Sequence, residues 1–250
     1  MKNNLKNNIS NWIKNYSDKF NIETLIVGVS GGIDSAVTST LCAETGLKTI
    51  VINMPIRQSS GEISRGEEHM TWLKNKYKNV SSKTINLDKT FNSFLDDFSL
   101  KAGEMAEANT RSRLRMVTLY HMAAQTNGIV VGTGNKVEDF GVGFYTKYGD
   151  GGVDISPIAD LMKSEVYSLG KDLGIVDSIM KAPPTDGLWG DTRTDEEQIG
   201  ATYEELEWAM TYEEGYSLTN RQQEVLDIYN KFNRQNKHKM EPIPVYKSIT

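Results

Sequence analysis

A short turn rich in serine and glycine, residues 30–35 (SGGIDS), lies between two apolar stretches of the chain. The preceding residues 25–29 (LIVGV) are typical of a central parallel strand, and residues 36–45 show helical spacing up to Gly46. The N-terminus of a helix presents unpaired N–H groups and about half a positive charge, and glycines let an anion approach the backbone. The turn therefore indicates a cradle for a phosphate group.

This turn is not a Walker A loop, because its glycines are adjacent and no lysine follows them. A Walker A loop has four residues between its glycines and a lysine directly after the second. From the residues alone, the turn could also be a plain connection that closes a strand–helix unit and binds no ligand.

Two acidic residues follow another apolar stretch, residues 128–131 (GIVV), which continues as GTGNKVED over residues 132–139. The carboxyl ends of parallel strands lie at one edge of a sheet, so Thr133 and Glu138 are expected beside the glycine turn. A carboxylate near a triphosphate usually holds Mg²⁺, and Asp34 and Glu138 could share one ion. Asp139 is an alternative ligand, and both acids could equally belong to a loop surface.

Three further segments carry polar groups that suit a nucleotide. Residues 143–154 (GFYTKYGDGGVD) are dense in glycine and aromatic residues, and Lys147 and Asp154 there suit contacts to a ring and a ribose. Lys163 stands at the start of a predicted helix, where its charge opposes the helix dipole. Binding of a phosphate explains a lysine at this position better than a contribution to helix stability does. A solvated lysine at the start of a helix would nevertheless destabilise the helix only slightly. Residues 181–200 contain two prolines and several charged groups and are a candidate lid.

A long helical pattern over residues 103–126 carries three arginines. Arg111 and Arg115 lie about 40° apart around this helix and can be a solvated pair, whereas Arg113 is displaced by about 160° from each. Arg113 shares a side with apolar residues such as Val117. It therefore needs an anionic partner or an interface, or its side chain extends past apolar neighbours into water.

Two histidines are interpreted as structural residues. His69 lies among acidic residues with no ligand spacing around it and is expected to be solvated. His121 falls in line with apolar positions of the long helix and is expected in the core.

The elements that must position these groups alternate between strands and helices. Apolar runs predict strands at residues 25–29, 49–53 and 128–131, with a short one near 83–85. Helical spacing predicts helices at residues 5–16, 36–45, 63–77, from 88, at 103–126, between Pro157 and Gly174, at 203–212 and at 219–232, with a solvated basic terminus at 236–242. This alternation predicts an α/β fold with a doubly wound parallel sheet and helices on both faces.

Composition restricts the class of protein. With 250 residues the chain can bury a full core, and one domain over residues 1–250 is the simplest arrangement. A net charge of −5, from 28 basic and 33 acidic residues without a basic block, argues against nucleic acid as a partner. Cys42 is the single cysteine, and no apolar run approaches the length of a membrane span. We therefore expect a cytoplasmic protein without disulfides or membrane contact.

The spelling SGGIDS resembles the SGGxDS pyrophosphate loop of the N-type ATP pyrophosphatases, which have an adenine nucleotide alpha hydrolase-like fold. Those enzymes cleave ATP to AMP and pyrophosphate, adenylating an oxygen that a nitrogen or sulfur nucleophile then displaces. Within this superfamily, residues from about 22 to 245 resemble ammonia-dependent NAD synthetase. The matching segments are TKYGDGG at 146–152 with the following Asp154, residues 157–163, Pro184-Thr185 and His238-Lys239.

The resemblance implies an enzyme that joins ATP to deamido-NAD through an adenylated nicotinate carboxylate, which ammonia converts to the amide of NAD. Asp34 and Lys163 would be catalytic, and Asp34 and Glu138 would hold Mg²⁺. ATP would contact Gly28, Val29, Ser30, Gly31, Gly32, Ile33, Asp34, Ser35, Thr133, Lys163 and Thr185. Deamido-NAD would contact Arg113, Lys147, Asp154, His238 and Lys239, at the boundary between the subunits of a homodimer.

Two departures from the family pattern leave questions open. The segment between Glu138 and Lys147 is slightly longer than in some members, so either Glu138 or Asp139 could be the metal ligand. Met240 stands where a second basic residue often follows the pair at 238 and 239, which weakens that contact.

Other functions are weighed against this one. The rival enzymes are the synthetase domain of GMP synthetase and the tRNA thiolases and lysidine synthetases, and the acidic balance and lone cysteine argue against the tRNA enzymes. A regulatory protein that binds ATP without turnover is the non-enzymatic alternative. About twenty residues precede the first strand, too few for a glutaminase domain with its nucleophilic cysteine, so free ammonia is expected as the nitrogen source. A separate glutaminase subunit is the alternative.

Overall fold

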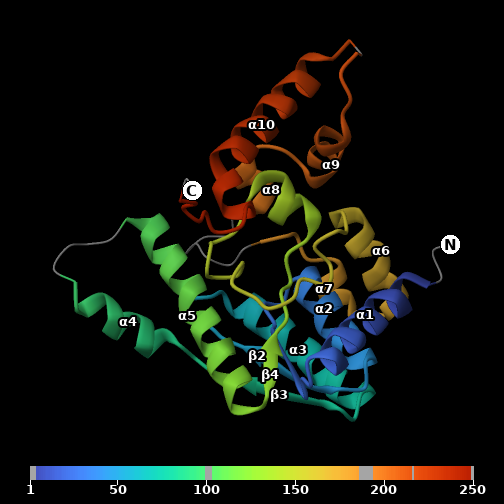
Figure 1. Cartoon of the computed structure of the whole chain (residues 1–250), viewed down its shortest axis with the longest axis vertical. Coiled ribbons are helices and arrows are strands. Elements are labelled where there is room, and N and C mark those ends of the chain that lie inside the picture. The colour runs from blue at the N-terminus through green and yellow to red at the C-terminus, as the bar shows by residue number, and fades with distance from the viewer. Residues whose placement is uncertain (1–3, 99–102, 186–193, 216, 249–250) are drawn as a thin grey trace.

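The computed structural model describes residues 4–98, 103–185, 194–215 and 217–248 of the chain (Figure 1). Its elements are, in chain order, α1 (Leu5–Lys19), β1 (Thr24–Gly28), α2 (Ile33–Glu44), β2 (Lys48–Asn53), α3 (Ser60–Lys76), β3 (Val80–Thr84), α4 (Asp88–Asp96), α5 (Glu104–Gln125), β4 (Gly128–Val130), the π-helix η2 (Val137–Val142), α6 (Lys163–Leu173), α7 (Asp177–Met180), α8 (Asp195–Ile199), α9 (Tyr203–Thr211) and α10 (Asn220–Met240). Within these residues, no helix has the length and apolar character that would be needed to cross a membrane.

The four strands form one parallel sheet in the order β3-β2-β1-β4. Strand β1 is central: Val27 pairs with Val51 of β2, and Leu25 pairs with Ile129 of β4. The chain builds the sheet outward from β1 to β3 and then returns to place β4 on the other side of β1. This reversal creates a switch point beside β1, where the carboxyl ends of open α/β sheets hold ligands.

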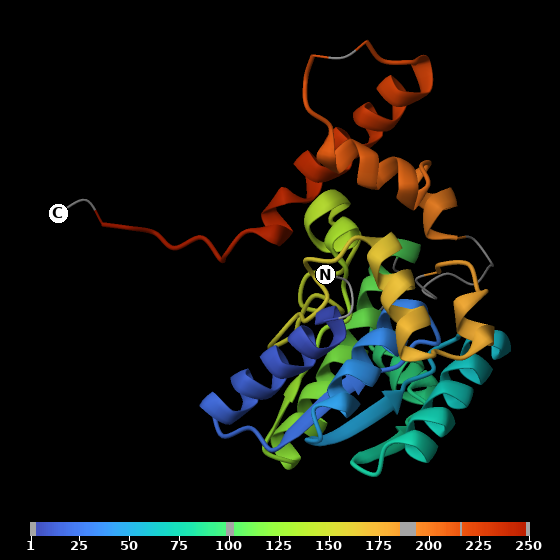
Figure 2. The same cartoon turned by 90° about the vertical axis from the view of Figure 1, so that its right-hand side faces the viewer.

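Side chains of β1 alternate between two cores, one on each face of the sheet. Leu25 and Val27 belong to a cluster with buried residues of α1, α2 and α6. Ile26 points the other way, into a cluster with buried residues of α4 and α5. Figure 2 shows α1, α2 and α6 in front of the sheet and α5 behind it. The predicted α/β fold with helices on both faces is therefore confirmed.

A third cluster lies beyond the carboxyl ends of the strands, where α8, α9 and α10 pack against η2 (Figure 1). Val137 and Val142 of η2 are fully buried in it. Asn233 and Asn236 of α10 donate side-chain hydrogen bonds to the carbonyls of Gly141 and Val142, at 2.7 and 2.8 Å. The segment that carries the two acids is thereby held over the edge of the sheet.

Several element boundaries differ from the sequence prediction, and two of the differences have a plain physical reason. Helix α3 begins at residue 60, because Ser59 and Glu62 form a reciprocal cap. Strand β3 occupies residues 80–84, since its polar sequence gives little apolar signal at an edge position. The last helix is predicted to end at residue 232, but α10 continues to residue 240 and includes most of the solvated basic terminus.

The predicted orientation of α5 is wrong. Arg113 and Val117 do share a side, but that side faces solvent, and Val117 is 57% exposed. Arg111, expected in water, is only 7% exposed, and its guanidinium lies 5.3 Å from the centre of the Phe91 ring. The small residues Ala108 and Ala123 lie on the packed side, where they allow close approach to the sheet.

Both histidine interpretations are also wrong. His69 is fully buried, with Nε2 2.9 Å from the hydroxyl of Ser39 and its ring stacked on Trp72. Burial lowers the pKa of His69 to about 4, so the ring is neutral. His121 is exposed, on the solvent side of α5.

The core beneath α4 predicts a stability difference between two phenylalanines. Phe91 is fully buried and Phe94, on the same helix, is 41% exposed. Phe91→Ala should lower the free energy of unfolding by about 3–5 kcal/mol, because the emptied volume is fully enclosed. The control Phe94→Ala should change it by less than about 1 kcal/mol. Urea denaturation measures both, and equal losses in the two variants would contradict this description of the core.

Candidate active site

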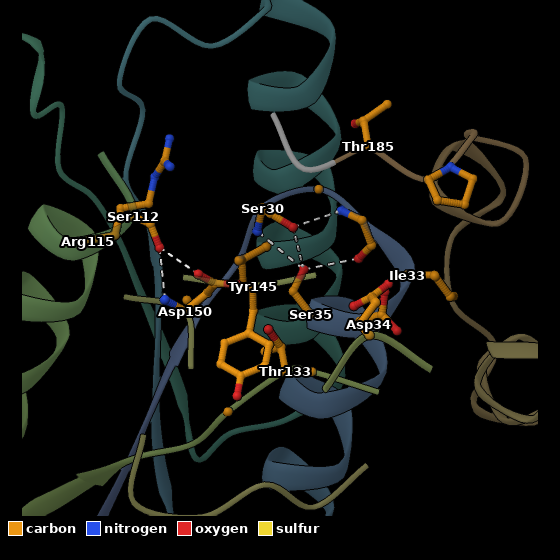
Figure 3. A pocket seen from close by; sticks show the side chains of 18 of the residues that line it. Ser30, Ile33, Asp34, Ser35, Ser112, Arg115, Thr133, Tyr145, Asp150 and Thr185 are labelled. Atoms are coloured by element: carbon orange, nitrogen blue, oxygen red, sulfur yellow. Dashed lines mark hydrogen bonds between the residues drawn. The ribbon is translucent and has the colours of Figure 1, made fainter. Parts of the chain in front are cut away.

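The glycine turn between β1 and α2 is closed by its two serines (Figure 3). The hydroxyl of Ser35 accepts from the backbone N–H of Ser30 at 3.2 Å and donates to the carbonyl of Gly32 at 3.0 Å. The hydroxyl of Ser30 accepts from the N–H of Gly32 at 3.2 Å. Helix α2 has Gly32 as its N-cap, and no side chain caps it. The first N–H groups of α2 are therefore directed at the turn, as anion binding requires.

Gly31 cannot be replaced in this turn by a residue with a side chain. Its φ angle is +89°, in the left-handed region, and an added Cβ would lie 2.5 Å from the carbonyl oxygen of Glu62. The second turn of α3 therefore packs directly on the backbone of the loop.

A buried ion cluster lies at the start of α2. The ammonium of Lys163 is 2.6 Å from Asp34 Oδ2 and 2.9 Å from Glu138 Oε1. Asn135, fully buried, donates its side-chain amide to Asp34 Oδ1 at 3.0 Å and accepts from the N–H of Glu138 at 3.2 Å. Residues from α2, η2 and α6 therefore converge on one ammonium group.

The cluster carries one negative charge in excess when both carboxylates are ionised. Burial favours a neutral Lys163, but Asp34 and Glu138 outweigh it and raise the pKa of the ammonium. Burial raises the pKa of Glu138, yet Lys163 and the hydroxyl of Tyr203 more than compensate and lower it. For Asp34, burial prevails over Lys163 and the pKa is raised. A further cation beside the two carboxylates would favour their ionised forms.

Tyr203 joins this cluster to the start of α8. Its hydroxyl donates to Glu138 Oε1 at 2.6 Å and lies 3.2 Å from Asp195 Oδ2. Burial and the neighbouring carboxylates raise the pKa of Tyr203, so the hydroxyl keeps its proton. Asp195 belongs to the predicted lid, of which residues 186–193 lie outside the described residues.

All residues predicted to contact ATP line one cavity of about 230 Å³, including Thr133, Lys163 and Thr185. The hydroxyl of Thr185 is 3.1 Å from Glu62 Oε1, which connects the segment after α7 to α3. In Figure 3, Thr185 lies across the pocket from Ser112 and Asp150.

Of the two acids in η2, it is Glu138 that contacts Lys163. Asp139 lies instead against Gly134, whose added Cβ would collide with its carboxylate. Burial, followed by the carboxylates of Glu138, Asp150 and Asp34, raises the pKa of Asp139 to about 8. The wide turn of a π-helix, a form often found at functional sites, presents these two consecutive acids.

The described residues contain no group of three or more His, Cys, Asp or Glu side chains that could hold a metal ion. Asp34 and Glu138 nevertheless suit Mg²⁺, which takes oxygen ligands and is usually held by one or two carboxylates together with substrate phosphates. The donor set therefore fits an ion that enters with a nucleotide.

The five residues predicted to contact deamido-NAD lie outside the lining of the main cavity. Three of them are connected by hydrogen bonds. A guanidinium nitrogen of Arg113 donates to the backbone carbonyl of Lys147 at 3.3 Å. The ammonium of Lys147 in turn donates to the backbone carbonyl of His238 at 2.8 Å. Lys239 donates to the carbonyls of Gly143 and Tyr145 and lines a second, smaller cavity. Asp154 is tied to β4 by the N–H of Val130.

Several residues of the site had no role in the sequence prediction. Asp150 accepts from Ser112 at 2.6 Å and lines both cavities, and its position in the glycine-rich segment 143–154 could have indicated it. Arg65, Arg115 and Tyr203 carry no local motif, since only the packing of α3, α5 and α9 brings them near the loop.

The family model, the related sequences and the solved structures that resemble this chain all carry names of NAD or NMN synthetases. The family model for NAD synthase matches residues 5–243. The chain is 38% identical over 230 residues to the NH(3)-dependent NAD(+) synthetase of Alkaliphilus metalliredigens, covering 88% of this chain and 89% of the relative. It resembles the solved NMN synthetase of Francisella tularensis with a TM-score of 0.89, 30% identity and 99% of each chain covered. The NH3-dependent NAD synthetase of Campylobacter jejuni follows, with a TM-score of 0.79, 25% identity and 98% and 99% of the two chains covered.

The environment of Asp139 predicts a pH-dependent stability. A raised pKa in the folded state, relative to 3.8 as the ordinary value, means that folding favours the protonated carboxyl. This stabilisation is present at low pH and is lost as the pH rises through about 8. Asp139→Asn should therefore be more stable than the unmodified chain at about pH 9, with a difference that shrinks toward about pH 4.

Urea denaturation across this pH range measures the effect. Asp172→Asn, an exposed change on α6, is the control and should follow the unmodified chain at every pH. A difference for Asp139→Asn that does not change with pH would disprove the assigned pKa shift.

Proposed function

The chain belongs to the NAD synthase family, and from this we propose that it amidates deamido-NAD with ammonia and ATP, giving NAD, AMP and pyrophosphate. The observation that carries the proposal is the position of the ion cluster of Lys163, Asp34 and Glu138 directly beside the glycine loop, in one cavity. Backbone donors for phosphates and carboxylates for a metal ion are thereby within reach of a single nucleotide.

ATP would bind with its phosphates on the glycine loop. The N–H groups at the start of α2 face the turn, and the glycines leave room for the phosphate oxygens. Thr133 and Thr185 line the same cavity on other segments and would contact the remainder of the nucleotide.

Magnesium would be held by Asp34 and Glu138 together with the phosphates of ATP. Bound there, the ion would supply positive charge to the phosphate oxygens. Lys163 would remain between the two carboxylates and fix their positions. Its positive charge would also act on the phosphate oxygens.

The reaction has two steps. First, an oxygen of the nicotinate carboxylate attacks the α-phosphorus, and the bond to pyrophosphate breaks. Lys163 and the loop N–H groups would stabilise the negative charge on the departing pyrophosphate. Ammonia then attacks the carboxyl carbon, loses a proton, and AMP departs with the former carboxylate oxygen. The second step requires mainly orientation and exclusion of water, because the mixed anhydride is already activated.

Deamido-NAD would lie along the surface formed by Arg113, Lys147, Asp154, His238 and Lys239. This surface includes Arg113 of α5, and Val117 of that helix and Tyr148 of the segment 143–154 are each more than half exposed. We propose that a second copy of the chain covers this side, so that the substrate lies between two subunits. Analytical ultracentrifugation measures this directly, and a monomer at assay concentrations would contradict it.

Free ammonia is the proposed nitrogen source, as the name of the Alkaliphilus metalliredigens relative indicates for that protein. We also propose that the reaction takes place in the cytoplasm, where ATP is available.

A second candidate substrate is nicotinate mononucleotide. The solved structure with a TM-score of 0.89 is named as an NMN synthetase, and the chemistry at the carboxylate would be the same. The two substrates differ only in the adenylate half, which would contact protein away from the reacting carboxylate.

An assay of the purified chain tests these proposals. With Mg-ATP, deamido-NAD and ammonium, we expect one AMP and one pyrophosphate for each NAD formed. Parallel reactions contain nicotinate mononucleotide in place of deamido-NAD, or glutamine in place of ammonium. A higher kcat/KM for the mononucleotide would favour the second candidate, and efficient use of glutamine alone would refute free ammonia as the nitrogen source.

Asp34→Asn should reduce kcat/KM by at least about 100-fold, because a neutral amide is a poor ligand for Mg²⁺ and the ion contributes several kcal/mol of charge stabilisation. The fold should persist, since burial already opposes the charge of Asp34. Asp172→Asn serves as the control for activity and for the urea midpoint. Unchanged activity in Asp34→Asn would remove this residue from the metal site.

A further inference from the structure

Arg65, on the second turn of α3, lies against the glycine loop. Its Nε donates to the carbonyl of Gly31 at 3.3 Å, and its Cβ is 3.3 Å from the position that a Cβ of Gly31 would occupy. The side chain lines the same cavity as residues 28–35. The position of Arg65 is determined by the packing of α3 on the loop, and no sequence motif indicates it.

The guanidinium of Arg65 has no carboxylate partner among the described residues. Its one hydrogen bond there is the Nε contact to Gly31, which leaves the two terminal nitrogens available. Other arginines of the chain are paired differently: Arg221 forms ion pairs with Glu205 and Glu224, and Arg57 with Glu107. Arg65 is thus a half-buried guanidinium beside the anion cradle, with no acid partner among the described residues.

The charges on the other side of the loop favour such a cation. The ammonium of Lys163 is already neutralised by Asp34 and Glu138, and the three groups together are negative when both acids are ionised. A triphosphate brings several further negative charges. Even with a divalent ion on the carboxylates, the phosphates distant from that ion need a separate positive group.

We propose that Arg65 binds the β- and γ-phosphoryl groups of ATP and so stabilises the departing pyrophosphate; this rests on the proposed function of the site. A guanidinium suits the task because its planar fork can donate two parallel hydrogen bonds to phosphate oxygens. Lys163 and Arg65 then act from opposite sides of the glycine loop. Lys163 positions the two carboxylates for the metal ion, and Arg65 binds the departing pyrophosphate.

The alternative is that Arg65 only braces the loop through Gly31. The variant Arg65→Gln separates the two roles, because its amide nitrogen, bonded to Cδ like the Nε of arginine, can still donate to the carbonyl of Gly31 but carries no charge. A brace would keep ATP binding in Arg65→Gln, whereas a ligand of the distal phosphates would lose it.

The test compares Arg65→Ala, Arg65→Gln and Arg65→Lys with Lys74→Ala, an exposed change on the same helix that removes the same charge. Titration calorimetry with Mg-ATP, AMP and pyrophosphate measures binding, and steady-state assays give kcat and the KM for each substrate. Circular dichroism and urea midpoints establish that each variant is folded. If Arg65→Ala does not fold, Arg65→Lys, which keeps the charge and most of the volume of the side chain, replaces it in the comparison.

Arg65→Ala should weaken Mg-ATP and pyrophosphate binding by roughly 10- to 100-fold, which is the usual loss for a charge-assisted hydrogen bond. AMP binding and the KM for deamido-NAD should stay within about twofold of the values for the unmodified chain. Arg65→Lys should recover part of the loss, and Lys74→Ala should show none. Arg65→Gln should weaken ATP binding as much as Arg65→Ala does. Full ATP binding in Arg65→Gln, equal weakening of ATP and AMP in Arg65→Ala, or no change for ATP would overturn the inference. Failure of the unmodified chain to make NAD would instead count against the proposed function, because the binding comparison does not depend on turnover.

Discussion

The ion cluster of Lys163 with Asp34 and Glu138 is the interaction on which the rest of the site depends. An ammonium group buried to this degree is stable only when paired, because removing charges from water costs several kcal/mol for each ion. The three residues come from α6, α2 and η2, which are far apart in the sequence. Their pairing therefore favours one arrangement of these elements, and that arrangement places the carboxylates at the mouth of the glycine loop.

The same cluster explains why the substrate completes the site. Two carboxylates and one ammonium leave a negative excess that suits a divalent cation, yet the described residues offer too few ligands to hold such an ion without further oxygens. Phosphate oxygens would provide them. Arg65, on the opposite side of the loop, provides positive charge that no acid among the described residues neutralises. In the proposed function, a divalent ion and ATP would complement these charges of the protein.

Much of this arrangement could be predicted from the sequence, because it depends on local signals. Apolar runs identified the strands, and parallel strands place their carboxyl ends at one edge, so the loop and Glu138 had to be neighbours. The orientation of α5 could not be predicted, because apolar residues occur on several sides of that helix and its buried side contains alanines and Arg111. Tyr203 and Arg65 were also inaccessible to sequence reasoning, since tertiary packing alone brings them to the site. That Glu138 and not Asp139 contacts Lys163 could be seen only in the structure, in the geometry of the π-helix η2.

The central claim is that this site activates a carboxylate by transferring to it the adenylyl group of ATP. Isotope transfer from deamido-NAD labelled with ¹⁸O in both carboxylate oxygens tests it most directly. We predict that mass spectrometry will find one labelled oxygen in the amide of NAD and the other in the phosphoryl group of AMP, in equal amounts. Unlabelled AMP, with label in phosphate or pyrophosphate, would contradict the account, because the carboxylate would then have attacked a different phosphorus.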